Sequence, residues 1–406
     1  MHKTHGMNEN QPIPLTGVVQ HYAWGGYEYI PALIGQTNAA REPFAELWMG
    51  VHGRGPARLQ LGASTPLLSE WLGSHPEALG AARHRFGEQL PFLFKILDVR
   101  EMLSIQSHPT KAQAEAGFRR ENEAGISLEA PHRNFKDANH KPEVMVALTD
   151  FWLLHGFRPR AEIQELLESN PAFRPLQPYF GGQSIYSLYK AIMELPQARV
   201  DELLQPLYGQ LQQAERLEKS SPGYWARRAF EQYSSAGFDR GIFSIYLFNL
   251  VHVAPGAGIY QGAGIPHAYL EGVNVELMAN SDNVFRGGLT VKHIDVPQLL
   301  QHLHFDSVAP KILTGQHRGA WEVAYETPAP DFQLNRIDLP AGSRYEPTPP
   351  PTAEIAIVLQ GGVRTGDGQV FSRGQSFFLP AGTAYTLTAT ETAELFKALV
   401  PTGQNQ

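Results

Sequence analysis

The segment MLSIQSHP carries polar side chains at alternate positions. In a β-strand, successive side chains point to opposite faces, so Ser104, Gln106 and His108 share one face while Leu103 and Ile105 share the other. A buried polar group without a partner costs about 1–3 kcal/mol, so an enclosed polar face needs partners. A metal ion would bind both the amide and the imidazole. On its own, however, a Gln-x-His pair is more often a solvated or hydrogen-bonded face than a metal site.

Two further segments supply the ligands that such a site would need. In NHKPEVMVAL, the alternation places Lys141, Glu143 and Met145 on one face, and a charged pair in an apolar strand is costly unless it is paired or coordinating. In YQGAGIPHAYL, His267 follows a turn rich in glycine, where the backbone can bend close to a ligand. The sequence thus offers one carboxylate and a second histidine.

Gln106, His108, Glu143 and His267 together form a nitrogen and oxygen ligand set for one divalent ion. The set favours zinc, with manganese or iron as alternatives, and the absence of cysteine excludes a thiolate site. Because only one ligand is anionic, a bound 2+ ion keeps a net charge of about +1 and acts as a Lewis acid.

Composition limits the possible partners and compartment. The chain has 406 residues, a net charge of −7 and no cysteine, which predicts about three domains and no disulfides. The acidic balance argues against a nucleic-acid or membrane surface, so a phosphate on a substrate would need a local cationic cluster. The first residues, MHKTHGMNENQPIP, lack the apolar core of a signal peptide. We expect a cytoplasmic protein, a monomer or a small homo-oligomer.

The hydrophobic period changes along the chain. Short strand-like runs dominate up to residue 157, apart from helical patterns at 65–85 and 109–122, and helical spacing of three and four follows over 158–235. Strand character returns at 242–253, IFSIYLFNLVHV.

The predicted metal ligands lie on both sides of the helical block. We therefore predict one catalytic β domain formed by residues 1–157 and 236–318, with 158–235 as a helical insertion. The predicted fold class is mainly β with jelly-roll barrels.

Residues 319–406 are predicted to form a second, metal-free barrel. Short strand patterns occur in WEVAYE, FQLNRIDL, EIAIVLQG, QVFSRGQSFFLPAG and YTLTA. The turn PAGTAY resembles a cupin hairpin, but Tyr385 stands where a metal-binding cupin often has histidine. We expect a structural or interface domain.

Longer motifs resemble one known family. LPFLFKILDVREMLSIQSHPTK, NHKPEVMVAL and QGAGIPHAYLEGVNVELMANSDNVFRGGLTVKHIDV are similar to the type I phosphomannose isomerases, zinc enzymes of the cupin superfamily, as are GVVQHYAWGG and AELWMGVHGRGPA. The resemblance covers roughly residues 15–300 and, more loosely, the C-terminal part. Ser107, Thr110 and Gly287 depart from the usual alanine, aspartate and alanine, and none of them is a proposed ligand.

The resemblance implies reversible conversion of mannose 6-phosphate to fructose 6-phosphate through a cis-enediol, with one zinc ion per chain. It assigns catalysis to Arg286 and places charged positions around the pocket. The candidates are Arg286, Glu276 and Lys141 for catalysis, and Ser104, Lys95, Asp282, Lys292 and Trp24 for substrate binding. The base stays open between Glu276 and a lysine-polarised water, and the phosphate could be held by Arg286 or by Lys292 with Ser104.

Two other classes of function remain possible. A non-catalytic cupin that binds a sugar phosphate would need the same pocket without an acid and base pair, and the presence of Glu276 and Arg286 argues against it. A cupin oxygenase would use Fe(II) with two histidines and one carboxylate, and the additional Gln106 argues mildly against that class.

Overall fold

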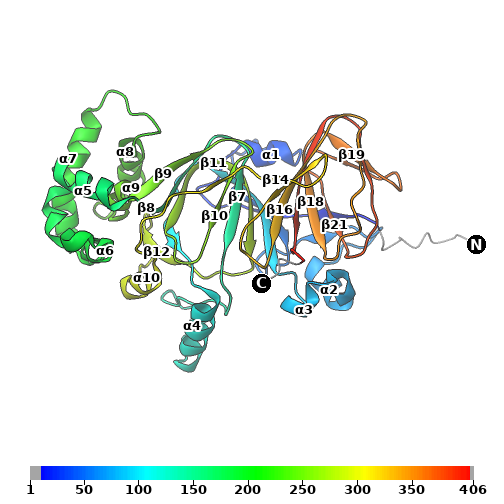
Figure 1. Cartoon of the computed structure of the whole chain (residues 1–406), viewed down its shortest axis with the longest axis horizontal. Coiled ribbons are helices and arrows are strands. Elements are labelled where there is room, and N and C mark those ends of the chain that lie inside the picture. The colour runs from blue at the N-terminus through cyan, green and yellow to red at the C-terminus, as the bar shows by residue number, and fades with distance from the viewer. Residues whose placement is uncertain (1–10, 403–406) are drawn as a thin grey trace, which may run out of the picture.

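The structure is a computed structural model in which residues 11–402 are described. The prediction that the first fourteen residues are not a signal peptide concerns a segment that lies mostly outside the described residues. Along the long axis of the molecule, a helical module is followed by a first β barrel and then by a second (Figure 1). Among the helices of residues 11–402, none has both the length and the apolar character needed to cross a bilayer.

The first barrel is an antiparallel sheet of eleven strands. Its strands are β2 (Val18–Gln20), β3 (Glu46–Gly50), β5 (Phe92–Val99), β6 (Ile105–Ser107), β7 (Glu143–Ala147), β8 (Phe151–Phe157), β9 (Phe248–Val253), β10 (Gly258–Gln261), β11 (His267–Ala279), β12 (Phe285–Gly288) and β13 (Ile312–Leu313). Its interior combines a polar end with an apolar cluster that includes Leu97, Met145, Phe151 and Ile259. The jelly-roll prediction is confirmed in its mainly antiparallel β architecture.

Strand β11 organises this barrel because it pairs with four others. Residues 273–279 pair with β5 and β7, whereas His267 pairs with Gln106 of β6 and with His155 of β8. The change of partner follows a bulge between Tyr269 and Glu271, and the next residue, Gly272, has φ of 130°, where an added Cβ would lie 2.6 Å from Phe151. A bulge with glycine allows the strand to bend there, so one strand can serve both parts of the barrel.

The helical module covers one end of the first barrel. It comprises α5 (Arg160–Ser169), η2 (Arg174–Gln183), α6 (Ile185–Glu194), α7 (Gln197–Gln213), α8 (Pro222–Tyr233) and α9 (Gly241–Leu247). Beside the barrel lie α4 (Lys111–Glu123) and α10 (Val296–His302), while α1 (Tyr29–Leu33), α2 (Leu68–Ser74), η1 (Pro76–Leu79) and α3 (Arg83–Phe86) form short helices in the N-terminal part. The helical patterns predicted at 65–85 and 109–122 are confirmed.

The predicted strand at 242–253 is half wrong. Residues Gly241–Leu247 form α9, and only Phe248–Val253 form a strand. All seven residues of α9 are buried, so the segment is apolar on every side and its sequence carries no period that separates a buried helix from a buried strand.

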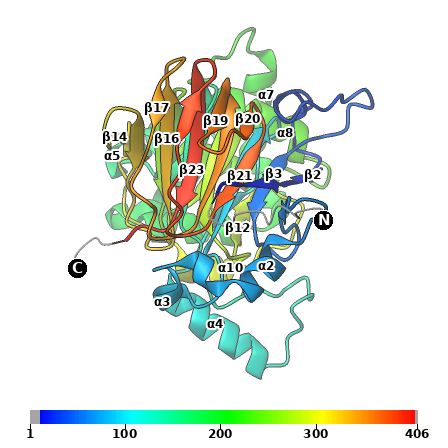
Figure 2. The same ribbon diagram turned by 90° about the vertical axis from the view of Figure 1, so that its right-hand side faces the viewer.

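The second barrel contains an eight-stranded and a four-stranded sheet. The first consists of β14 (Gln316–His317), β15 (Glu322–Tyr325), β16 (Gln333–Leu339), β23 (Ala393–Leu399), β18 (Glu354–Gln360), β21 (Ser376–Leu379), β1 (Ile13–Thr16) and β4 (Arg58–Leu59), and the second of β17 (Arg344–Tyr345), β22 (Leu387–Ala389), β19 (Gly362–Thr365) and β20 (Val370–Ser372). The strands predicted in this region are confirmed. Figure 2 shows this barrel with β16 and β23 side by side, as their pairing requires.

The two barrels share an apolar layer. Outward-facing residues of the first barrel, such as Val146 and Val275, belong to the same buried cluster as Ile355 and Phe378 of the second. In addition, β1 near the N-terminus pairs with β21 near the C-terminus. The predicted domain boundaries stay a prediction, but strands from the two ends of the chain share one sheet.

Candidate active site

Three predicted metal ligands meet at the end of the first barrel. His108 Nε2 lies 3.5 Å from Glu143 Oε1, and His267 Nε2 lies 3.3 Å from Glu143 Oε2. One ligand atom from each residue lies within 4.8 Å of the others. His108 and His267 are fully buried and Glu143 is 1% exposed, so this cluster lies inside the protein.

The backbone fixes the direction of both imidazoles. His108 Nδ1 bonds the carbonyl oxygen of Asn283 at 2.8 Å, and His267 Nδ1 bonds that of Ile265 at 2.9 Å. Each Nδ1 must therefore carry the proton, which leaves each Nε2 lone pair facing Glu143. Burial lowers the pKa of His108 to about 4, which keeps this imidazole in the neutral form that binds metals.

The cluster contains buried polar atoms that have no hydrogen-bond partner. They are Nε2 of His108, Nε2 of His267 and Oε2 of Glu143. Leaving such atoms unpaired is costly, and all three would be satisfied by one divalent cation. Two imidazole nitrogens and a carboxylate suit zinc, so the residues present fit the predicted metal.

Lys141 lies beside the carboxylate of the cluster. Its Nζ is 2.9 Å from Glu143 Oε1 and its side chain borders a cleft. Burial alone would raise the pKa of Glu143, but Lys141 and His108 outweigh it and hold this pKa well below its usual range. Glu143 is therefore an anion at neutral pH.

Gln106 lies opposite two functional residues, His267 on β11 and Arg286 on β12. Strand β6 covers only Ile105–Ser107, so it is shorter than the predicted strand, and Ser104 and His108 flank it. Ser104 and Gln106 both line a cleft next to the group formed by His108, Glu143 and His267, called the metal cluster below. The role of Gln106 as a fourth ligand stays a prediction.

A second buried charge cluster lies on the neighbouring strands. Lys95 Nζ is 2.9 Å from Glu276 and 3.5 Å from Glu46. Burial opposes the charge on Lys95, but Glu276 and Glu46 outweigh this and raise its pKa, while burial raises the pKa of Glu276. Lys95 reaches the cleft, whereas Glu276 lies behind it at 3% exposure.

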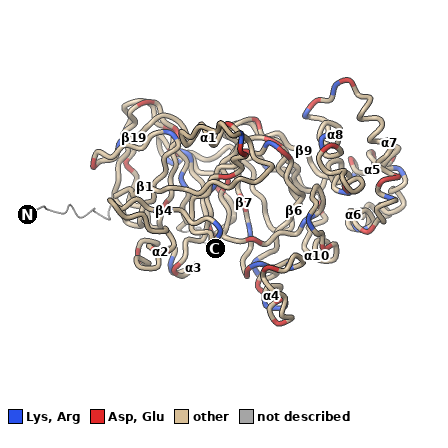
Figure 3. The backbone as a smooth tube through the Cα atoms, turned by 180° about the vertical axis from the view of Figure 1, so that it is seen from behind, with Lys and Arg blue, Asp and Glu red and all other residues tan. Residues whose placement is uncertain are grey.

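Two adjoining clefts open beside the metal cluster, with volumes of 460 and 500 Å³. They share Trp24, Arg286 and Lys292. The first cleft is also lined by charged residues, of which Arg54, Lys95, Arg133, Lys136 and Lys141 are cationic and Glu46, Glu129 and Asp282 are acidic. Elsewhere the two signs are interspersed along the backbone (Figure 3). The cationic excess is thus local, in a chain with a net charge of −7.

Of the predicted catalytic and substrate-binding residues, all but Glu276 line these clefts. Arg286 and Lys292 have no hydrogen bond or ion pair from their side chains to other residues in the described range 11–402. Burial lowers the pKa of the Arg286 guanidinium, and burial followed by repulsion from Arg286 and Arg54 lowers the pKa of Lys292. Unpaired cations that repel one another form a site suited to an anion.

The sequence analysis missed Arg54. Its Nη2 lies 2.7 Å from Asp282 Oδ1, and its guanidinium lies over the Trp48 ring. Burial opposes ionisation of Asp282, but His52 and Arg54 outweigh it and lower its pKa to about 2. Arg54 lies in the loop HGRG, where strand alternation cannot indicate which way a side chain points. The only signal in the sequence is a cationic residue between two glycines.

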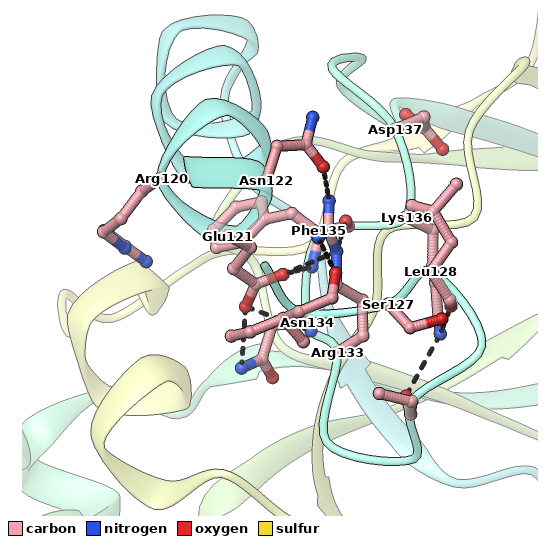
Figure 4. A network of polar contacts seen from close by, with 12 residues as sticks. Arg120, Glu121, Asn122, Ser127, Leu128, Arg133, Asn134, Phe135, Lys136 and Asp137 are labelled. Carbon is pink, nitrogen blue, oxygen red and sulfur yellow. Dashed lines mark hydrogen bonds and ion pairs between the residues drawn. The ribbon is translucent and has the colours of Figure 1, made fainter. Parts of the chain in front are cut away.

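The loop after α4 forms another wall that the sequence analysis missed. Arg133 pairs with Glu121 at 2.9 Å and donates to Asn122 and to the carbonyls of Ile126 and Phe135 (Figure 4). Glu121 also accepts from the Phe135 amide. These bonds fix the loop, whose residues Leu128, Glu129, Asn134 and Lys136 line the first cleft.

Comparisons with known proteins agree with this site. Residues 13–160 match the family model of the phosphomannose isomerase type I catalytic domain. The mannose-6-phosphate isomerase of Escherichia coli is 38% identical over 80% of this chain and 83% of that protein, and the human enzyme is 33% identical over 94% and 96%.

Solved structures of a relative show the same fold. Mannose 6-phosphate isomerase from Salmonella typhimurium, bound to fructose 6-phosphate and zinc, superposes with a TM-score of 0.85 at 32% identity. The match covers 97% of this chain and all of that one. With this similarity along nearly the whole chain, and with the metal cluster at the family's motifs, the chain belongs to the type I phosphomannose isomerase family.

Proposed function

We propose that the protein is a zinc-dependent isomerase that interconverts mannose 6-phosphate and fructose 6-phosphate. The observation that carries the proposal is the group of unpaired ligand atoms, on His108, Glu143 and His267, beside a cleft with unpaired cations. A cleft of 460 Å³ falls in the size range of small-molecule sites. Relatives that bind zinc and fructose 6-phosphate support the choice of metal and substrate.

The reaction moves a proton between C2 and C1 of the open-chain sugar through a cis-enediol. Bound zinc would supply an electrophile that polarises the carbonyl and hydroxyl oxygens. The guanidinium of Arg286 lies at the junction of the two clefts, where it can donate to an oxygen on which negative charge develops. No other residue in the described chain competes for its donors.

The acid and base roles belong to groups that reach the cleft. Lys141 borders it and lies 2.9 Å from Glu143, so its ammonium can donate to a substrate oxygen near the metal ligands. Glu276 is buried behind Lys95 and has a raised pKa. We therefore favour Lys141 over Glu276 as the residue nearest the reacting atoms. Lys95, which is paired with Glu276, lies between that carboxylate and the cleft.

The phosphate is proposed to bind where the cations have no internal partner. Lys292 and Arg286 meet this condition within the described residues, and Ser104 lines the same cleft as both. Arg54 shares the first cleft with them but is partly neutralised by Asp282. We therefore assign the phosphate to Lys292 and Ser104, with Arg54 in a secondary role.

The test is a coupled assay of fructose 6-phosphate formation with and without a chelator. The proposal predicts about one zinc per chain, loss of activity on chelation and recovery with Zn²⁺. A metal-free protein with full activity would refute it. Binding of mannose 6-phosphate without turnover would instead support the non-catalytic class.

A second assay separates the roles of Arg286. If its forked guanidinium stabilises the enediol, Arg286→Lys should lower kcat by roughly 10²-fold, because a lysine point charge cannot reproduce that geometry, while zinc content stays unchanged. If Arg286 only anchors the phosphate, KM should rise at nearly constant kcat. Unchanged kcat and KM would remove Arg286 from the mechanism.

A further inference from the structure

Asn283 lies beside the predicted metal ligands, and both polar atoms of its side chain are hydrogen-bonded. It is fully buried and belongs to the short segment between β11 and β12. Buried side-chain amides need partners for both the oxygen and the nitrogen. Both atoms of Asn283 bond the segment that precedes β7, so this residue links two parts of the chain that are distant in sequence.

The side chain of Asn283 is enclosed by residues 136–139. Its Oδ1 accepts from the amide of Lys136 at 2.7 Å and from that of Asp137 at 3.4 Å. Its Nδ2 donates to the carbonyls of Asp137 at 2.9 Å and Asn139 at 2.8 Å. This arrangement fixes the chain only two residues before Lys141 and four before Glu143.

The main chain of Asn283 contacts the other side of the metal cluster. Its carbonyl oxygen accepts from His108 Nδ1 at 2.8 Å. The position of that carbonyl depends on where the side chain is held, because both belong to one residue. A single residue therefore bonds one metal ligand directly and holds the segment that leads to another.

We propose that Asn283 is a positioning residue that sets the geometry of His108 and Glu143 together. Hydrogen-bond partners of metal ligands fix the tautomer and the ring orientation, and their loss typically costs about 10–100-fold in metal affinity. Asn283 touches neither substrate nor metal in this account. Its effect reaches the site through His108 on one side and through the Lys136–Asn139 turn on the other.

The direct test measures zinc binding without any substrate. Metal-free wild type and Asn283→Asp compete with a chromophoric chelator for zinc. The aspartate keeps the acceptor for Lys136 but faces the carbonyls of Asp137 and Asn139 with an oxygen in place of a donor. We expect the dissociation constant for zinc to rise about 10–100-fold.

Asn280 provides a matched control in the same segment. Its Nδ2 donates to the carbonyl of Leu90 at 2.7 Å, away from the metal cluster. Asn280→Ala also removes a side-chain hydrogen bond near β11, and we expect it to leave the zinc dissociation constant unchanged. A purely structural role of Asn283 would make both variants unfold more easily without a difference in zinc affinity, and that result would overturn the proposal.

Cobalt substitution gives a second measurement that reports ligand geometry. The d–d absorption of Co²⁺ at the site should change in Asn283→Asp and stay unchanged in Asn280→Ala. If Asn283→Asp does not accumulate as folded protein, the zinc dissociation constant and the cobalt spectrum are measured on Asn283→Ser instead. Wild-type affinity and an unchanged spectrum in a folded variant would overturn the proposal. Because no sugar phosphate is present, this failure would be distinct from failure of the proposed isomerase function.

Discussion

Both barrels bury a lysine between two glutamates, yet within residues 11–402 a group of side chains able to hold a metal ion is found in the first barrel alone. In the first, Lys95 lies between Glu46 and Glu276. In the second, Lys397 Nζ lies 3.0 Å from Glu322 and 3.2 Å from Glu354. Buried charges of this kind need close partners, and both barrels provide them. A buried ionic cluster is therefore not what distinguishes the active barrel.

The difference lies in the histidine and carboxylate atoms that are buried without a hydrogen-bond partner. In the second barrel, Tyr345 donates to Glu322 at 2.6 Å and Tyr385 donates to Glu354 at 3.1 Å. In the first barrel, both ligand histidines and Glu143 keep an unpaired buried atom. Unpaired ligand atoms, rather than buried charge, thus locate the site.

The largest expected effect comes from removing the anionic ligand. Glu143→Gln should reduce zinc from about one per chain to nearly none and lower isomerase activity by roughly 10³-fold, because the electrophile is lost. Elemental analysis and the coupled assay on the same sample measure both.

The matched change in the second barrel is Glu354→Gln, whose amide oxygen can still accept from Lys397. We expect it to leave zinc content and activity at the wild-type level. Loss of zinc in Glu354→Gln, or retention of zinc in Glu143→Gln, would contradict the comparison.

Replacing each of the buried lysines, Lys95 and Lys397, by methionine separates an effect on stability from an effect on activity. Lys95→Met and Lys397→Met each leave two buried carboxylates without their cation, which should lower the free energy of unfolding by about 3–5 kcal/mol. Only Lys95 lines the cleft, so only Lys95→Met should also lower kcat at a temperature where both variants are folded. Urea unfolding and steady-state kinetics test this, and equal kinetics for the two variants would show that Lys95 is only structural.

The sequence was informative where side chains alternate in strands. Glu143 stands out in EVMVA because a carboxylate begins an otherwise apolar strand, and the alternation correctly predicted that Lys141 and Glu143 lie together. Arg54 and Lys136 lie in loops, where no period relates a residue to a face. The pairing of β1 with β21 joins residues more than 350 positions apart, and no local pattern encodes such a contact.

Acid should destabilise the first barrel through two buried histidines. Burial lowers the pKa of His108 and of His155 to about 4, and no histidine follows His317 in the sequence. With a lowered pKa in the folded state, the unfolded chain binds protons first as pH falls below about 6.5. Stability is then lost progressively down to about pH 4, by about 3 kcal/mol for each histidine.

The midpoint of urea unfolding of the metal-free protein, measured from pH 7.5 to 4.5, tests this expectation. His155 Nδ1 bonds Gln261 Oε1 at 2.7 Å. In His155→Asn, the asparagine amide can still donate to Gln261, but it cannot be protonated. The variant should lose less stability than wild type as pH falls. Parallel pH profiles for the two proteins would refute the role of His155.

The smallest expected effect concerns a polar contact between the second barrel and the segment that precedes β7. Asp331, just before β16, lies 2.8 Å from His140 Nε2, and His140 immediately precedes Lys141. Both partners are largely buried, so the bond should stabilise the segment that presents Lys141 to the cleft. Asp331→Ala removes one buried hydrogen bond, worth about 1–1.5 kcal/mol, and should lower kcat/KM by up to about tenfold.

Asp331→Asn keeps a hydrogen-bonding side chain and should retain most of the activity. Zinc content should equal that of wild type in both variants, because neither change touches His108, Glu143 or His267. If Asp331→Ala has wild-type kcat/KM, the second barrel supports the site only through the shared apolar layer. If activity falls in Asp331→Ala and is retained in Asp331→Asn, the second barrel helps to position Lys141, and both barrels contribute to the active site.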